Sequence, residues 1–139
     1  MIVLDTNVLS ELLRAIPEPA VVRWTARQPL DTLFTTTVTQ AEMLYGVKLL
    51  PAGQRREQLE EAVATLFAED FVGRVLPFDG DAAAAYARIA AERKRTGRPI
   101  SQFDAQIAAI AQSRGSHLAT RNVGDFEGCV LYIVNPWQP

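Results

Sequence analysis

The chain has 139 residues, of which 48% are hydrophobic and 22% are charged, and its formal net charge is −2. These values are typical of a globular domain and exclude a disordered or fibrous chain. A slightly acidic protein does not attract nucleic acid over its whole surface, so any binding of nucleic acid must be local.

No segment of the sequence has the features of a targeting or membrane-spanning segment. The apolar start Met1–Leu4 is too short for a signal peptide, and no later run approaches the roughly 20 apolar residues that a membrane span needs. The single cysteine, Cys129, excludes an internal disulfide and a cysteine-rich zinc site. We therefore expect a cytoplasmic protein that does not associate with membranes and that folds as a single domain over residues 1–139.

Short apolar runs rich in β-branched residues alternate with helical patterns along the chain. The predicted strands are Ile2–Leu4, Leu33–Thr36, Arg74–Leu76, His117–Ala119 and Leu131–Val134. Apolar residues at helical spacing lie between them, at Val8, Leu9, Leu12 and Leu13, at Leu59, Val63, Leu66 and Phe67, at Ala82, Tyr86, Ile89 and Ala90, and at Ile107, Ile110 and Ala111. Because no hairpin turns join the strands, this pattern predicts an α/β fold with a mainly parallel sheet covered by helices on both faces.

Polar residues follow three of the predicted strands. Asp5, Thr6 and Asn7 follow the first strand, Glu42 comes soon after the second, and Thr120, Arg121, Asn122 and Asp125 follow the fourth. A further acid, Asp104, lies at the start of the helix that precedes the fourth strand. Ligands of open α/β sheets bind at the carboxyl ends of the strands, so we expect these groups to meet in one cleft.

Helix capping is an alternative explanation for three of these acids. Thr39-x-x-Glu42, Ser101-x-x-Asp104 and Asn122-x-x-Asp125 each resemble a capping box. Asp5 has no equally good explanation of this kind, because Thr6 or Asn7 could cap the first helix. Capping and catalysis are also compatible, since a cap fixes the rotamer of a carboxylate.

Carboxylates that converge in a partly buried cleft repel one another and require a proton or a cation. Carboxylate and amide oxygens suit Mg²⁺ or Mn²⁺ better than zinc. The one histidine, His117, falls inside a predicted strand, and we interpret it as structural. Carboxylate clusters that bind Mg²⁺ commonly serve phosphoryl transfer.

Four blocks in order, MIVLDTNVLSELL, TTTVTQAEMLYGV, GRPISQFDAQIAAIA and LATRNVGDF, followed by a closing NPW, carry a specific resemblance. The sequence resembles PIN-domain proteins and, among them, the VapC toxins of bacterial toxin–antitoxin pairs, in particular the FitB-like branch. The resemblance implies a three-layer α/β/α sandwich and a Mg²⁺-dependent endoribonuclease, with Mn²⁺ as an alternative ion. The implied reaction is in-line attack of a metal-activated water on an RNA phosphodiester, without a protein nucleophile.

The resemblance also implies roles for individual residues. Asp5 and Asp104 match the acids that hold the metal, Glu42 matches a third acid that holds the metal or activates water, and Thr6 with Asn7 matches the neighbours that orient the first acid. Thr120 is a further candidate for an orienting residue. Asn122 would orient a metal-bound water, and Asp125 would supply the remaining negative charge. The basic residues Arg93, Lys94, Arg95, Arg98 and Arg121 become candidates for RNA backbone binding, although a solvated last helical turn explains the first four equally well.

The resemblance further implies a cognate VapB-like antitoxin and a homodimer. The main alternative is a non-catalytic PIN-like module that binds nucleic acid or protein, against which the complete set of acids argues. A haloacid-dehalogenase-like phosphatase would need a second acid at the position of Asn7. A receiver domain would need a phosphorylated Asp after a central strand and a companion lysine pattern, which Pro77-Phe78-Asp79 does not provide.

Overall fold

The structure is a computed structural model that describes residues 1–130 and 132–139. Within this part, five strands form one sheet in the order β3-β2-β1-β4-β5, and every pairing is parallel. The strands are β1 (Ile2–Leu4), β2 (Leu33–Thr36), β3 (Val75–Leu76), β4 (His117–Ala119) and β5 (Ile133–Val134). The predicted parallel α/β fold is confirmed; residue 131, the predicted start of the last strand, lies outside the described residues.

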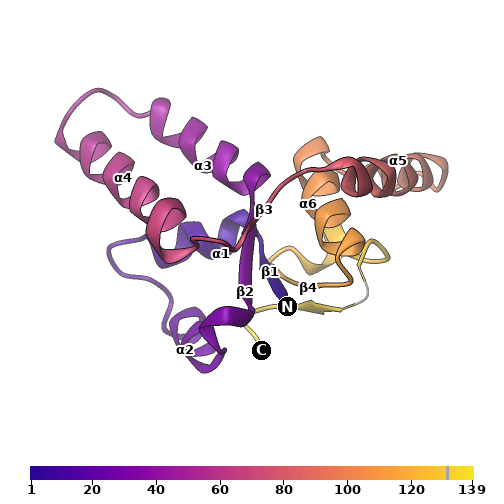
Figure 1. The fold of residues 1–139 in the computed structure, drawn as a ribbon, viewed down its shortest axis with the longest axis horizontal. Helices are drawn as coiled ribbons and strands as arrows, with labels where there is room; N and C mark the ends of the chain where they lie inside the picture. The colour runs from indigo at the N-terminus through magenta and orange to yellow at the C-terminus, as the bar shows by residue number, and fades with distance from the viewer. Residues whose placement is uncertain (131) are drawn as a thin grey trace.

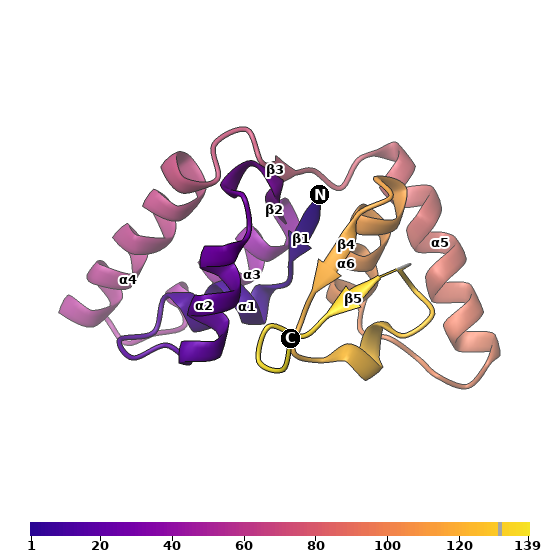
Figure 2. The ribbon, with the colours of Figure 1, turned by 90° about the horizontal axis from the view of Figure 1, so that it is seen from below.

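Helices cover both faces of this sheet (Figures 1 and 2). They are α1 (Thr6–Leu12), α2 (Pro19–Arg27), α3 (Thr37–Lys48), α4 (Gln54–Thr65), α5 (Gly80–Arg95) and α6 (Gln102–Ser113). In both views α1 to α4 lie on one side of the strands, and α5 with α6 lies on the other. The arrangement is the three-layer α/β/α sandwich that the resemblance to PIN-domain proteins implied.

The alternation of side chains along the central strands explains the two layers. On β1, Val3 belongs to the apolar cluster with α5 and α6, whereas Leu4 belongs to the cluster with α1 to α4. On β4, Leu118 and Ala119 divide in the same way. Because both faces are buried, the last two residues of each strand are apolar, and polar residues follow directly where the strands end.

Two glycines lie at the boundaries of helices on the two sides of the sheet. Gly53 stands immediately before α4, and Gly97 follows the last turn of α5 with a φ of 71°. The turn at Gly97 is a Schellman motif, in which the Arg98 N–H donates to the Arg93 carbonyl at 2.9 Å and the Gly97 N–H donates to the Lys94 carbonyl at 3.2 Å. The chain therefore folds back against the end of α5 before it enters α6.

Candidate active site

Asp5 is the most constrained acid of the predicted site. It lies at the end of β1 with 3% of its surface exposed, and its N–H donates to the Ala119 carbonyl of β4 at 2.9 Å. Its Oδ1 accepts from the Thr6 N–H at 2.8 Å. Its Oδ2 accepts from the Thr120 hydroxyl at 2.8 Å and from Asn7 Nδ2 at 3.1 Å.

Asp5 is also the N-cap of α1, so the interpretation that this helix is capped by Thr6 or Asn7 is wrong. The reason is that β1 passes into α1 without a connecting loop, which places the extended cap conformation at Asp5 itself. The side chains of Thr6 and Asn7 are thereby left free to contact other groups of the site.

Burial dominates the ionisation of Asp5. The pKa of this carboxyl is raised from 3.8 to about 6, mainly by burial and against the opposing hydrogen bonds from Thr120 and Thr6. The negative charges of Asp104 and Glu42 are smaller contributions to the same increase. These carboxylates are therefore electrostatic neighbours, as the strand-end pattern predicted.

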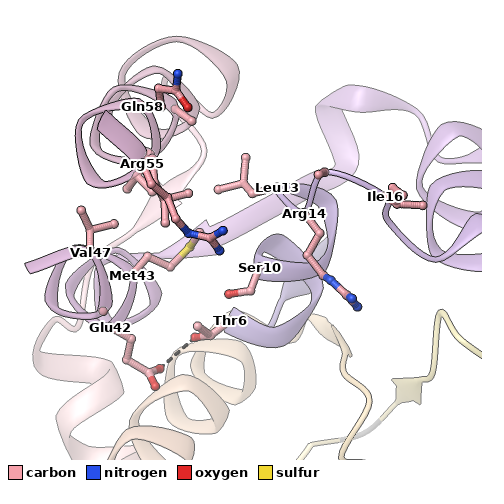
Figure 3. Close-up of a pocket in the computed structure, with 15 residues that line it drawn as sticks. Thr6, Ser10, Leu13, Arg14, Ile16, Glu42, Met43, Val47, Arg55 and Gln58 are labelled. Atoms are coloured by element: carbon pink, nitrogen blue, oxygen red, sulfur yellow. Dashed lines mark hydrogen bonds between the residues drawn. The ribbon is translucent and has the colours of Figure 1, made fainter. Parts of the chain in front are cut away.

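Glu42 lies on α3 and is held by α1. The Thr6 hydroxyl donates to its Oε1 at 2.8 Å, as Figure 3 shows. The Thr6 hydroxyl oxygen also lies 3.0 Å from that of Thr39, which is fully buried. Since Thr6 has one hydroxyl proton and donates it to Glu42, Thr39 must be the donor to Thr6. Burial raises the pKa of Glu42, the Thr6 hydrogen bond opposes this, and the charge of Asp104 adds to it.

Thr39 contacts the site through Thr6, a role that the sequence pattern did not predict. The proposed capping box from Thr39 to Glu42 is wrong, because the N-cap of α3 is Thr36, whose hydroxyl accepts from the Thr39 N–H at 3.0 Å. Helix α3 begins directly after β2, so its N-cap is Thr36, the last residue of that strand. The junction resembles that at Asp5, where α1 follows β1 without a loop. A sequence signal for a residue like Thr39 does exist. It is a threonine in the first helical turn after a strand, on the same side of the helix as an acid.

Asp104 occupies the first turn of α6. The predicted cap at Ser101 is confirmed, since its hydroxyl accepts from the Asp104 N–H at 3.2 Å. Burial raises the pKa of the half-buried Asp104 carboxyl, Ser101 opposes this, and the negative charge of Asp125 adds to it. Capping thus explains the place of Asp104 in the helix but leaves its charge to be neutralised.

Asp125 lies in the 3-10 turn Val123–Phe126, and Asn122 directly precedes this turn. Both residues are exposed. Asn122 occupies the N-cap position without a side-chain capping hydrogen bond, so the predicted capping box there is wrong. Its N–H instead donates at 3.0 Å to the hydroxyl of Thr120, the same hydroxyl that donates to Asp5. Thr120 therefore joins this turn to the centre of the site.

The chemistry of the donor set fits a hard divalent cation. Within residues 1–130 and 132–139, no group of three or more His, Cys, Asp or Glu side chains is arranged to hold a metal ion as it stands. The acids nevertheless raise one another's pKa values, which is the repulsion that a divalent cation relieves. The oxygen ligands that could hold such an ion come from Asp5, Glu42 and Asp104, with Asp125 beside them.

The basic residues of the predicted RNA-binding set have different surroundings. Arg121 is exposed, and its guanidinium carbon lies 5.2 Å from the centre of the Trp137 ring. Arg95 and Arg98 make weak surface pairs of 3.7 Å with Glu92 and Glu127, and Lys94 is exposed. Arg93 differs from them, because its guanidinium donates to backbone carbonyls of two loops.

A cavity of about 780 Å³ adjoins the acids on the side of α1, α3 and α4. Its lining is largely apolar and includes Leu13, Met43, Val47, Leu59 and Val63. Thr6 and Glu42 form part of its wall, so it reaches the site itself. Figure 3 shows Arg55 extending from α4 toward α1 across this space.

A PIN domain profile matches residues 2–127. The chain belongs to the PIN domain family. Among similar PIN proteins, VapC ribonuclease Y4jK of Sinorhizobium fredii is 43% identical over 139 residues, covering 100% of this chain and 99% of the relative. Toxin FitB of Neisseria gonorrhoeae is 40% identical over 142 residues, covering 99% of both chains.

Solved PIN structures agree with this membership. The structure of FitAB bound to an IR36 DNA fragment has a TM-score of 0.92 and 40% identity, and it covers 100% of this chain and 97% of the other. The resemblance to VapC and FitB toxins is thus confirmed. Membership of the PIN ribonuclease family implies dependence on a divalent metal. None of the described helices is both long and apolar enough to span a membrane.

Proposed function

We propose that this chain is the toxin of a toxin–antitoxin pair and acts as an endoribonuclease that uses Mg²⁺, with Mn²⁺ as an alternative, in the cytoplasm. Residues 1–139 would act as a single PIN domain. The observation that carries the proposal is the placement of buried Asp5 beside Glu42 and Asp104 at the carboxyl edge of a PIN sheet. Relatives of the same length named as a VapC ribonuclease and as toxin FitB support it.

Asp5, Glu42 and Asp104 would hold the cation. A divalent ion supplies positive charge to the phosphate and increases the acidity of water beside it. The three donors on Asp5 hold its carboxylate in one orientation, with both oxygens fixed by hydrogen bonds. Such fixed orientation contributes to rate because the groups need no reorganisation during the reaction.

Glu42 would also accept a proton from the attacking water. Its Oε1 accepts from the Thr6 hydroxyl, and within the described part of the chain its Oε2 has no hydrogen-bond partner. One carboxylate oxygen is therefore available to a water molecule or to the cation. Asn122 and Asp125 are exposed, and they would orient water and add negative charge.

The partners proposed for the chain are RNA, a VapB-like antitoxin and a second copy of itself. The apolar cavity between α1, α3 and α4 supports an antitoxin segment at that place, because it is lined by apolar side chains and ends at Glu42. A segment bound there could bring an arginine to the acids, where a guanidinium binds carboxylates in pairs. RNA would approach from the exposed side that carries Arg121.

Cleavage of a fluorescent RNA by the purified full chain tests this proposal. We expect cleavage with Mg²⁺, none with EDTA, and none for Asp104→Asn. The matched control is Glu61→Gln, which removes an exposed carboxylate on α4 and should cleave at the wild-type rate. RNA binding without cleavage in any divalent metal would instead favour the non-catalytic binding module.

A further inference from the structure

Arg93 makes an unusual set of contacts for a basic residue in the last turn of a helix. Its Nε donates to the Arg98 carbonyl at 2.7 Å. Its Nη1 donates to the Asp125 carbonyl at 2.9 Å and lies 3.5 Å from the Glu127 carbonyl and 3.1 Å from Cys129 Sγ. One guanidinium therefore joins the loop after α5 to the segment 125–129.

Both of these segments are shaped to present acceptors to Arg93. The Schellman turn at Gly97 folds the chain back, so that the Arg98 carbonyl meets the side chain of Arg93. On the other side, Phe126 and Cys129 are buried in the core, and the Cys129 N–H donates to the Phe126 carbonyl at 3.0 Å. The segment between them is thereby held over the end of α5.

Each of the two segments leads to an acid of the site. The loop after α5 runs through Arg98 into the Ser101 cap, and Asp104 follows in the first turn of α6. The other segment carries Asp125 itself. The Arg93 guanidinium therefore links the segment that carries Asp125 to the loop that leads to Asp104. Asp125 itself is exposed, so its place depends on how this segment is held.

We propose that Arg93 is a positioning residue that holds the segment bearing Asp125 against the loop leading to Asp104, and so sets the affinity of the site for a divalent cation. The inference rests on the proposed function. Arg93 then supports the loops around the site and does not bind RNA, because its Nε and Nη1 both donate hydrogen bonds to backbone carbonyls of the protein. Lysine could not replace it, since a single ammonium cannot span both segments as the planar guanidinium does.

Isothermal titration calorimetry of the metal-free full chain with Mn²⁺ tests the proposal. We expect Arg93→Gln to weaken Mn²⁺ binding about 10- to 100-fold, the range found when groups that orient metal ligands are removed. The control is Arg88→Gln, which removes the same charge from an exposed position on α5 and should leave the affinity unchanged. Equal affinities for the two variants would overturn the proposal.

A second background separates positioning from general stability. If Arg93 acts through Asp125, then Arg93→Gln should have almost no effect on Mn²⁺ affinity in a chain that already carries Asp125→Asn. An equal loss on both backgrounds would show that Arg93 acts by another route and would overturn the proposal. If Arg93→Gln does not fold, Arg93→Lys is compared with Arg88→Lys instead. We expect Arg93→Lys to lower the affinity for Mn²⁺ severalfold, and an unchanged affinity would contradict the proposal.

The proposed function can fail separately from this inference. Wild-type chain that binds Mn²⁺, loses it on Asp104→Asn and keeps it on Arg93→Gln would reject only the role of Arg93. Wild-type chain that binds no divalent cation would reject both.

Discussion

The hydroxyl oxygens of Thr6 and Thr39 lie 3.0 Å apart, although the two residues are 33 positions apart in the chain. Thr39 is fully buried and donates to Thr6, which in turn donates to Glu42. The orientation of Glu42 therefore depends on a buried hydroxyl that reaches it only through Thr6.

Thr39→Val should lower the rate of RNA cleavage about fivefold, because the hydrogen bond that it removes contributes on the order of 1 kcal/mol. Thr39→Ser restores the hydroxyl and should recover most of the rate. Thr25→Val, which removes a hydroxyl bonded to the Val21 carbonyl on α2, is the matched control. Cleavage by Thr39→Val at the rate of this control would contradict the role of the hydroxyl pair.

Asp5→Asn should abolish cleavage while the melting temperature of the metal-free protein stays the same or rises. The substitution removes a buried negative charge and its repulsion from Glu42 and Asp104, which offsets the loss of charge-assisted hydrogen bonds. Thermal unfolding in EDTA and an RNA cleavage assay in Mg²⁺ measure the two effects. Residual cleavage at the wild-type rate, with contaminating nuclease excluded, would end the assignment of Asp5.

The metal-free protein should become more stable as the pH falls from 7.5 to 5.5. The pKa of Asp5 is raised from 3.8 to about 6 in the folded state, so the folded protein binds a proton more tightly than the unfolded chain. The stabilisation by Asp5 is fully present below pH 3.8, a range in which other carboxyl groups also titrate. It is lost as the pH rises through about 6. Its limiting size is on the order of 3 kcal/mol. Glu42 and Asp104, whose pKa values are also raised, act in the same direction.

Saturating Mg²⁺ should remove or reverse this pH dependence, because the cation binds the ionised carboxylates. Melting temperatures across the pH series, with Mg²⁺ and with EDTA, provide the comparison. In EDTA, Asp5→Asn should show a flatter profile than wild type. A profile for the variant as steep as that of wild type would assign the effect to other groups.

Arg121→Ala should weaken RNA binding by a few-fold and reduce the slope of log affinity against log salt by about 1, as expected for the loss of one phosphate contact. Trp137 packs beside the Arg121 guanidinium, and Trp137→Leu should produce part of the same loss. Arg23→Ala removes an exposed arginine of α2 and is the control for net charge. An effect of equal size in Arg23→Ala would show that net charge alone explains the result.

The proposed antitoxin should be the product of a neighbouring gene and should inhibit cleavage when purified with this chain. We expect that replacing one of its arginines restores cleavage in the complex, since a guanidinium against Asp5, Glu42 and Asp104 would neutralise them. Cleavage assays of the complex across a series of such substitutions test this. Inhibition that persists in every variant would point to steric cover of the RNA site.

The strands and the predicted acids could be located from sequence for a physical reason. Strands buried on both faces favour apolar and β-branched residues, so β1, β2 and β4 are visible as short runs, and the polar residues after them mark the sheet edge. Helix caps were predicted less well. Asp5 and Thr36 are caps because strands pass directly into helices, which depends on backbone conformation at each junction and not on residue spacing.

Contacts between distant segments are the part that residue patterns do not contain. Arg93 lies in a basic run that is also typical of a solvated helix end, yet its Nη1 donates to a carbonyl 32 positions away. The partnership of Thr6 with Thr39 is of the same kind. Both depend on how helices pack over the sheet, which a single sequence specifies only through the whole fold.

The absence of a loop between β1 and α1 ties the accuracy of the site to the pairing of β1 with its neighbours. A slip of one residue between β1 and β4 would send Val3 and Leu4 to the wrong apolar layers and turn the Asp5 carboxylate away from Thr120. Such a register error is penalised by the whole core. The packing that folds the chain therefore also aligns the Asp5 carboxylate. Insertion of a single residue between Leu4 and Thr6 would abolish the activity even if the chain still folded.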